Sequence, residues 1–246
     1  MVAIIIQART GSTRFEEKVL KKIYNQYSIL DLIIKNLKEL GQKIIIATTS
    51  NESDKKIVSK ALEYHLDYYC GSENNVLKRF IDCAHKFHIS KFLRICSDNV
   101  FIQLEFLSNL IENSNSDYDY ISYKIGSKNA ILTHWGLFGE LVTLNALEKV
   151  QKRTKDQKDL EHVTYYIYNH PDEFKIKYID APKKLLREDI RLTIDTYEDF
   201  QICREIIEYL EKNKLKWSYK NILEYLDDNK YLLEKMVFNI ENNEKS

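Results

Sequence analysis

Short apolar segments alternate with amphipathic helical segments over the first hundred residues, and this alternation constrains the fold more than any other sequence feature. The predicted strands are Val2–Gln7, Lys43–Thr48, Asp67–Cys70 and Lys91–Cys96. Helices with apolar residues at helical spacing are predicted between them at Ile29–Leu40, Ser53–Tyr64 and Asn74–Phe87. Four strands joined by helices of this length predict an α/β fold with a doubly wound, mostly parallel sheet flanked by helices.

The pattern is less regular beyond residue 100. Further strands are predicted at Tyr118–Tyr123, Gly136–Thr143, Phe174–Ile179 and Ile190–Ile194. Further helices are predicted at Phe106–Ile111, Leu144–Val150, Asp159–Asn169, Tyr197–Lys212, Tyr219–Leu226 and Tyr231–Phe238, with Lys124–His134 irregular. Because no repeat and no Gly/Ser/Pro linker divides the chain, we expect one domain over residues 1–212. It includes an excursion at about 118–179 and is followed by a helical appendage over 213–246.

Charge and hydropathy exclude several classes of partner. The 246 residues include 37 acidic and 37 basic side chains, whereas a duplex-binding protein normally shows a basic balance. No apolar run approaches the roughly 20 residues that a membrane-spanning helix needs. The first residues enter a strand directly, without the basic and apolar regions of a secretory signal. We therefore expect a cytoplasmic protein with neither a nucleic-acid nor a membrane partner.

The loop after the first strand is the most unusual segment, and ligands of open parallel sheets bind beyond the carboxyl ends of the strands. It reads Gln7-Ala8-Arg9-Thr10-Gly11-Ser12-Thr13-Arg14-Phe15-Glu16-Glu17-Lys18. Only eight of the 37 basic residues are arginines, so each arginine is a candidate for a bidentate phosphate contact. Two arginines, a lysine, hydroxyls and a flexible glycine predict a polyphosphate cradle. The alternative is a solvated loop whose cations pair with Glu16 and Glu17.

Ordered motifs along the chain carry a family resemblance. The pattern A-R-x-x-S-x-R-x-x-x-K, filled by Ala8, Arg9, Ser12, Arg14 and Lys18, resembles the signature of the CMP-sugar synthetases, and most of all their SpsF-like branch. These enzymes are the cytidylyltransferases that act on neuraminate and 3-deoxy-manno-octulosonate. Further similar segments are Ala47-Thr48-Thr49, Gly71-Ser72-Glu73-Asn74-Asn75-Val76-Leu77, Arg94-Ile95-Cys96-Ser97-Asp98-Asn99, Glu161-His162-Val163-Thr164 and Arg191-Leu192-Thr193-Ile194-Asp195-Thr196.

The resemblance implies a glycosyltransferase-A-like nucleotidyltransferase fold and transfer of CMP from CTP to an acidic sugar or a sugar- or polyol-like phosphate. The acceptor oxygen would attack the α-phosphorus and expel pyrophosphate. The implied nucleotide-binding residues are Ala8, Arg9, Thr10, Gly11, Ser12, Arg14, Lys18, Thr48, Gly71, Ser72, Asn75, Val76, Arg94 and Ser97. Arg14, Lys18 and Asp98 are the implied catalytic residues, and Glu140, His162 and Arg191 are candidates for acceptor contacts. A homodimer formed through the excursion is a further expectation.

Mg²⁺ is the implied cofactor, with Asp98 and Asp195 as its ligands. Each aspartate follows a predicted strand, so both can reach the same end of one sheet despite 97 residues of separation. Two carboxylates supplemented by phosphate oxygens and water suit Mg²⁺ rather than zinc. A single aspartate after a strand is more often a turn former or a helix cap, but two of them beside a phosphate loop favour the metal.

Departures from the family pattern leave two alternatives. Glu16-Glu17 replaces the usual Pro-Gly before the loop lysine, Val100 replaces a common proline, and Phe138 replaces the aspartate of a Gly-Leu-Asp motif. One alternative is a nucleotide-sugar glycosyltransferase that uses the D-x-D sequence of Asp117 and Asp119. The other is a catalytically weak nucleotide-binding partner protein whose helical tail docks another subunit.

Overall fold

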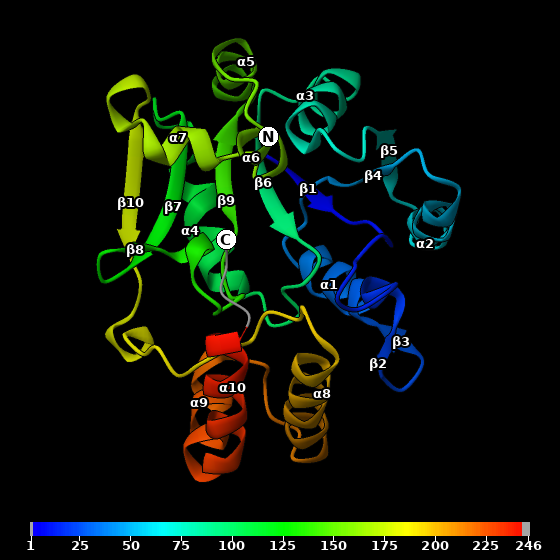
Figure 1. Cartoon of the computed structure of the whole chain (residues 1–246), viewed down its shortest axis with the longest axis vertical. Helices are drawn as coiled ribbons and strands as arrows, with labels where there is room; N and C mark the ends of the chain where they lie inside the picture. Colours follow the sequence, from blue (N-terminus) through cyan, green and yellow to red (C-terminus); the bar gives the residue numbers. More distant parts are fainter. Residues whose placement is uncertain (1, 243–246) are drawn as a thin grey trace.

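A mixed sheet forms the centre of the fold in a computed structural model that describes residues 2–242 (Figure 1). The strand order across the sheet is β10-β7-β9-β6-β1-β4-β5, and β8 pairs with β7. These strands are β1 (Ala3–Gln7), β4 (Ile44–Thr49), β5 (Asp67–Gly71), β6 (Lys91–Cys96), β7 (Tyr120–Ile125), β8 (Lys128–Asn129), β9 (Glu140–Thr143) and β10 (Ile176–Asp180). The strands β6, β1, β4 and β5 run parallel, as the sequence alternation predicts, and β9 pairs antiparallel with both β6 and β7.

Helices cover both faces of this sheet. They are α1 (Ile29–Lys38), α2 (Lys55–Glu63), α3 (Val76–Lys86), α4 (Leu104–Glu112), α5 (Leu144–Arg153), α6 (Gln157–Glu161), α7 (Tyr165–Asn169), α8 (Tyr197–Lys212), α9 (Tyr219–Asp228) and α10 (Lys230–Asn242). Short 3-10 turns lie at Lys18–Leu20, Glu52–Asp54, Asn113–Asn115, Ala130–Leu132, Pro171–Glu173 and Lys183–Leu185. None of the helices in residues 2–242 combines the length and the apolar character that crossing a bilayer requires.

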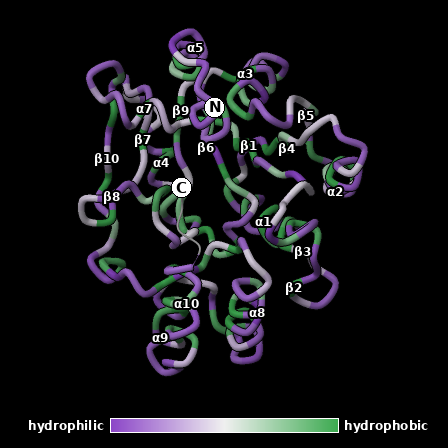
Figure 2. Tube along the Cα trace, in the orientation of Figure 1, coloured by the Kyte–Doolittle hydropathy of each residue, from purple (hydrophilic) through white to green (hydrophobic). Residues whose placement is uncertain are grey.

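The two faces of the sheet have separate hydrophobic cores, because successive side chains of a strand point in opposite directions. In β1, Ile4 and Ile6 join the cluster under α1, α4 and α8, whereas Ala3 and Ile5 join the cluster under α3 and α5. Helices α9 and α10 pack on the first of these clusters. Figure 2 shows hydrophobic and hydrophilic residues alternating along α8, α9 and α10, as expected for helices with one buried face.

Several predicted elements differ from the structure. Ile190–Ile194 is not a strand: this buried segment has no ladder partner among the described residues. The backbone N–H groups of Leu192 and Thr193 donate to the carbonyl of His134, and that of Ile194 donates to the carbonyl of Asp98. Asp159–Asn169 is not one helix, because Val163 has a positive φ of 25° and separates α6 from α7. The strand predicted at Gly136–Thr143 begins only at Glu140, after Gly136 with a φ of 61°.

Some short elements carry too little periodicity to be predicted. The antiparallel hairpin of β2 (Lys22–Tyr24) and β3 (Tyr27–Ser28) lies between the loop after β1 and α1. Its turn contains Asn25, whose positive φ of 49° is tolerated by asparagine. Ser28 and Asp31 then form a capping box that starts α1. The hairpin therefore connects the most unusual loop of the chain to the first core helix.

Candidate active site

The carboxyl ends of β1 and β6 open onto a cavity of about 480 Å³. Its walls come from the loop after β1, the loop after β6, the segment 130–138, helices α6 and α7, and Asp195. The predicted site residues that line it are Arg9, Ser12, Arg14, Lys18, Arg94, Ser97, Asp98, His162 and Asp195. The other predicted site residues are not part of this lining.

Asp54 holds the loop after β1 in place through hydrogen bonds. Oδ1 of Asp54 accepts the backbone N–H of Thr10 at 2.7 Å and its hydroxyl at 2.6 Å. Oδ2 accepts the hydroxyls of Thr48 and Thr49 at 3.2 and 2.5 Å. Burial raises the pKa of Asp54, but the hydrogen bonds from Thr10 and Thr49 outweigh it and hold the pKa below its usual value. Thr10 and Thr48 are thus buried supports of the loop, as is Ala8, which is 1% exposed.

The two arginines of the loop line the cavity and form only long ion pairs. Arg9 lies 3.8 Å from carboxylate oxygens of both Glu73 and Glu161. Arg14 is half exposed and lies 3.6 Å from Oδ1 of Asp195. Glu17, one of the departures from the family pattern, pairs with Lys56 on α2. Its negative charge is therefore partly neutralised outside the cavity.

Lys18 joins the two aspartates that are predicted to share a metal. Its ammonium donates to Oδ1 of Asp195 at 2.9 Å and to the carbonyl of Ile194 at 2.6 Å, and it lies 3.9 Å from Oδ2 of Asp98. The backbone N–H of Ile194 also donates to the carbonyl of Asp98 at 3.1 Å. The two aspartates therefore lie at one edge of the sheet, although only Asp98 follows a strand.

Asp195 is an ionised carboxylate surrounded by cations. Burial raises its pKa, but Lys18, Arg191 and Arg14 outweigh burial and lower the pKa to about 2. A carboxylate oxygen from each aspartate faces one cation, and hard oxygen donors of this kind fit Mg²⁺. No group of three or more His, Cys, Asp or Glu residues within 2–242 could hold an ion.

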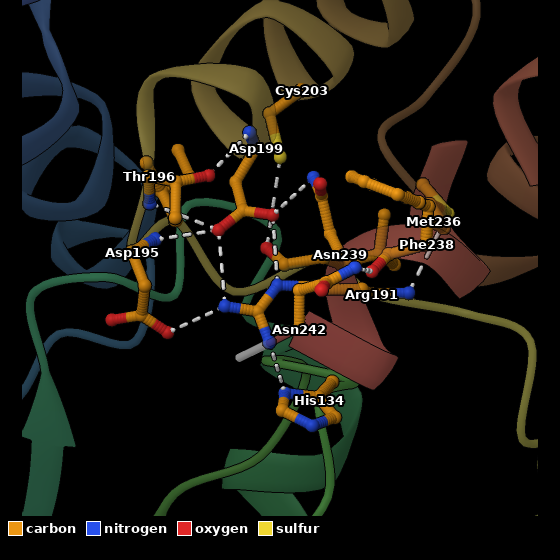
Figure 3. Close-up of polar contacts among 12 residues, drawn as sticks. His134, Arg191, Asp195, Thr196, Asp199, Cys203, Met236, Phe238, Asn239 and Asn242 are labelled. Carbon is orange, nitrogen blue, oxygen red and sulfur yellow. Dashed lines mark hydrogen bonds and ion pairs between the residues drawn. The ribbon is translucent and has the colours of Figure 1, made fainter. Parts of the chain in front are cut away.

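Arg191 is buried beside Asp195 rather than exposed to an acceptor. It is 1% exposed and pairs with Asp199 at 2.7 Å and with Oδ2 of Asp195 at 3.1 Å (Figure 3). A third contact joins its Nη1 to Nδ1 of His134 at 2.7 Å. Arg191 does not line the cavity.

Arg94 and Glu140 form a buried ion pair at the base of the cavity. Glu140 also accepts the hydroxyls of Tyr120 at 2.5 Å and Thr164 at 2.8 Å. Burial opposes the charge of Arg94, but Cys96 and Glu140 outweigh burial and raise its pKa above the usual value. Arg94 reaches the cavity wall, whereas Glu140 is 1% exposed behind it.

The loop after β5 lies apart from the cavity lining. Gly71 ends β5, and a Cβ on it would lie 2.8 Å from a ring carbon of Tyr69 and 3.0 Å from Cγ of Arg79. Asn75 caps α3 through Lys78 N–H, Val76 is buried, and Ser72 Oγ accepts the N–H of Asn75. Since any side chain at Gly71 would collide with its neighbours, the loop has room for glycine only.

Arg79 is a notable side chain that sequence reasoning missed. It is fully buried under this loop, where Nη1 donates to the carbonyl of Ser72 at 2.9 Å. Its Nε and Nη2 have no hydrogen-bond partner among residues 2–242. Burial lowers its pKa to about 10, and nearby Arg9 contributes. The scarcity of arginine was a signal that could have identified it.

Aromatic and hydroxyl side chains form the far wall of the cavity. His162, Thr164, Tyr165 and Tyr168 come from the segment around α7, and residues 130–133 face the same space. Burial lowers the pKa of His162, and Glu161 only partly opposes it. Gly136 and Phe138, from the region that departs from the family pattern, also line this wall.

Known proteins resemble this chain over most of its length. A family model described as cytidylyltransferase matches residues 3–241. The chain belongs to the cytidylyltransferase family. The spore coat polysaccharide biosynthesis protein SpsF of Bacillus subtilis (strain 168) is 31% identical over 215 residues, which cover 83% of this chain and 85% of SpsF.

Solved structures share the fold. A cytidylyltransferase from Leptospira borgpetersenii serovar Hardjo-bovis (strain JB197) is 25% identical with a TM-score of 0.82, covering 94% of this chain and 96% of that one. CMP:2-keto-3-deoxy-manno-octonic acid synthetase, solved in complex with CTP, is 12% identical with a TM-score of 0.59, covering 87% and 99%. The predicted glycosyltransferase-A-like nucleotidyltransferase fold is therefore confirmed, as is the resemblance to the SpsF-like branch.

The D-x-D sequence lies outside the cavity of this cytidylyltransferase fold. Asp117 is exposed and pairs with Lys175, and Asp119 accepts the backbone N–H of Lys175 at 2.9 Å. Neither aspartate lines the cavity. The two carboxylates connect the residues before β7 to the residue before β10. This structural role explains their position, and no bound metal or nucleotide is required.

Proposed function

We propose that the protein transfers CMP from CTP to an acidic sugar or a sugar- or polyol-like phosphate, releasing pyrophosphate, in the synthesis of a surface polysaccharide or glycan. One observation carries the proposal: Arg9, Ser12, Arg14 and Lys18 stand on an Asp54-anchored loop and face Asp98 and Asp195 across one cavity. The family, the SpsF relative and the fold shared with a synthetase solved in complex with CTP support it.

Positioning and charge neutralisation are the proposed contributions of the protein to catalysis. An acceptor oxygen attacks the α-phosphorus of CTP, a new phosphorus–oxygen bond forms, and the bond to the bridging oxygen of pyrophosphate breaks. Arg9, Arg14 and Lys18 offset the negative charge that builds on the leaving pyrophosphate. Binding both reactants at one edge of the sheet makes the reaction effectively unimolecular, which lowers its entropic cost.

Asp98 and Asp195 are the proposed ligands of Mg²⁺. When bound there, the ion supplies further neutralisation of phosphate charge. Lys18 faces both carboxylates in the structure, and its ammonium would neutralise charge on a bound triphosphate. Arg191 holds the second oxygen of Asp195 throughout.

The far wall of the cavity is the proposed acceptor site. Arg94 supplies a positive charge at its base, and His162, Tyr165 and Tyr168 supply aromatic and polar contacts. Because a guanidinium donates several hydrogen bonds in a fixed fork and Glu140 pairs with Nη1, the remaining donors suit an acceptor that carries a carboxylate or phosphate.

Pyrophosphate release is the decisive assay. The protein is incubated with CTP, Mg²⁺ and a panel of acidic sugars, sugar phosphates and polyol phosphates, and we expect release with at least one of them. No release across the panel, together with no CTP binding by calorimetry, would contradict the proposal.

Substitutions locate the reaction in this cavity. Asp98→Asn and Arg14→Ala should each lower turnover by at least about 100-fold, because Asp98 is a proposed ligand of the Mg²⁺ and Arg14 is a proposed charge partner of the reacting phosphates. Arg204→Ala is a matched control, since Arg204 is a surface residue of α8 paired only with Glu208 among the described contacts. Near-normal turnover in either site variant would place the reaction elsewhere.

We further propose that the protein acts as a cytoplasmic homodimer. Strand β10, at one end of the excursion, forms an edge of the sheet and is available for pairing. Light scattering should give twice the mass of the chain, and the mass of a single chain would contradict the dimer.

A further inference from the structure

The C-terminal helix α10 is bonded to the network that holds Asp195. Its Asn239 donates from Nδ2 to Oδ1 of Asp199 at 3.1 Å, and the sulfur of its Met236 accepts the backbone N–H of Arg191 at 3.4 Å (Figure 3). Asn239 is 5% exposed and Met236 is fully buried. Neither residue lines the cavity. We propose that α10 positions Asp195 through Asp199 and Arg191, and that Asn239 is a positioning residue of the site; this inference rests on the proposed function.

Asp199 is the centre of the network. It occupies the third position of α8 in a capping box with Thr196, and it is 1% exposed. Its Oδ2 accepts the backbone N–H groups of Asp195 and Thr196, both at 3.0 Å. One carboxylate oxygen therefore fixes the backbone on which Asp195 stands, while the other oxygen faces α10 and Arg191.

Arg191 connects Asp199 to the carboxylate of Asp195. Its Nε donates to Oδ1 of Asp199 at 2.7 Å, and its Nη2 donates to Oδ2 of Asp199 and Oδ2 of Asp195, both at 3.1 Å. The other oxygen of Asp195 faces Lys18 at 2.9 Å and Arg14 at 3.6 Å. Arg191 therefore holds Oδ2 of Asp195 on the side of α8, the scaffold side, whereas Oδ1 faces the cations of the cavity.

Asn239 fixes the geometry of this scaffold side. Its amide donates to the same Asp199 oxygen that Nε of Arg191 uses, so removing the amide takes away one of the two described hydrogen bonds to that oxygen and loosens the pairing of Asp199 with Arg191. Networks of buried, charge-assisted hydrogen bonds respond as a unit. The consequence at Asp195 would be a less ordered carboxylate and, under the proposed function, weaker binding of Mg²⁺ and CTP together.

Hydrogen exchange tests the network without reference to any ligand. The amides of Asp195 and Thr196 are measured in the full-length protein, in Asn239→Ala and in Glu234→Ala. Glu234 is an exposed position of the same helix and serves as the matched control. We expect both amides to exchange at least about threefold faster in Asn239→Ala than in the control. Unchanged exchange would overturn the inference, whatever the protein binds.

A double-mutant cycle tests the consequence for function. Calorimetry measures CTP affinity in the presence of Mg²⁺ for the wild type, Asn239→Ala, Asp195→Asn and the double variant. We expect Asn239→Ala to weaken binding at least about threefold in the wild type and to change little in the Asp195→Asn background, because coupled residues are not additive. Equal weakening in both backgrounds would show a general effect on the fold and overturn the inference.

The two experiments separate the inference from the proposed function. Faster exchange in Asn239→Ala with a wild-type protein that binds no CTP would support the positioning role and contradict the proposed function. Normal CTP binding with unchanged exchange and unchanged affinity in Asn239→Ala would support the function and overturn the role of α10.

Discussion

Oδ1 of Asp54 accepts two hydrogen bonds from Thr10, one from the backbone N–H at 2.7 Å and one from the hydroxyl at 2.6 Å. The two residues are 44 positions apart in the sequence, and the contact forms without any bound substrate. Because Thr10 stands between Arg9 and Ser12, Asp54 sets the position of the groups that we assign to the triphosphate.

Asp54→Asn should weaken the binding of CTP and of pyrophosphate by about tenfold or more. The amide lacks the charge that strengthens these hydrogen bonds. Each carboxylate oxygen accepts one backbone N–H, from Thr10 or from Thr49, and the NH₂ group that replaces one oxygen can accept neither. Calorimetry with each ligand measures the effect, and Asp82→Asn, on the surface of α3, is the matched control. Unchanged affinity for both ligands would show that the loop is positioned without Asp54.

Asp195 should stabilise the fold in a pH-dependent way. Its pKa is lowered from 3.8 to about 2, so its contribution is fully present above the unfolded value of 3.8 and is lost as the pH falls toward 2. The shift corresponds to about 2 kcal/mol of unfolding free energy. Urea unfolding of the wild type and Asp195→Asn across this range should give a difference that shrinks as the pH falls. A difference that stays constant from pH 5 to pH 2 would contradict the lowered pKa.

The regular part of the fold could be predicted from the sequence because its signals are local. The apolar residues of β1 and β4 and the helical spacing of α1 and α3 are visible in short windows. Ile190–Ile194 could not be assigned correctly in this way. A buried apolar segment has the same sequence pattern whether its N–H groups bond to a neighbouring strand or to isolated carbonyls. The break at Val163 also depends on a backbone angle that no local pattern specifies.

The candidate site was predictable where side chains face the cavity and not where they support it. Arg9, Arg14 and Lys18 are unusual in type and cluster in sequence, so they could be found. Thr10 belongs to the same loop, but its inward orientation depends on Asp54 in another loop. Arg191 belongs to a family motif, and only the fold shows that its guanidinium is directed at Asp199.

Arg79→Met should raise the free energy of unfolding by about 1 kcal/mol or more. The change removes a buried guanidinium whose Nε and Nη2 have no partner among residues 2–242, at the cost of one bond to the carbonyl of Ser72. Urea unfolding measures the difference. Lys78→Met on the exposed face of the same helix controls for the change of side chain, and a clear loss in Arg79→Met alone would contradict the expectation.

Glu140→Gln should lower the free energy of unfolding by about 3–5 kcal/mol, because it leaves the buried charge of Arg94 without its partner. The glutamine oxygen can still accept the hydroxyls of Tyr120 and Thr164, so most of the loss should come from the unpaired guanidinium. Urea unfolding is compared with Glu224→Gln, an exposed position of α9. Adding Arg94→Met to Glu140→Gln should recover part of the lost stability, because the uncompensated charge is then absent. If the double variant is as unstable as the sum of the single changes, the two side chains do not stabilise the fold through their charges. The base of the cavity at Arg94 is then held by packing alone.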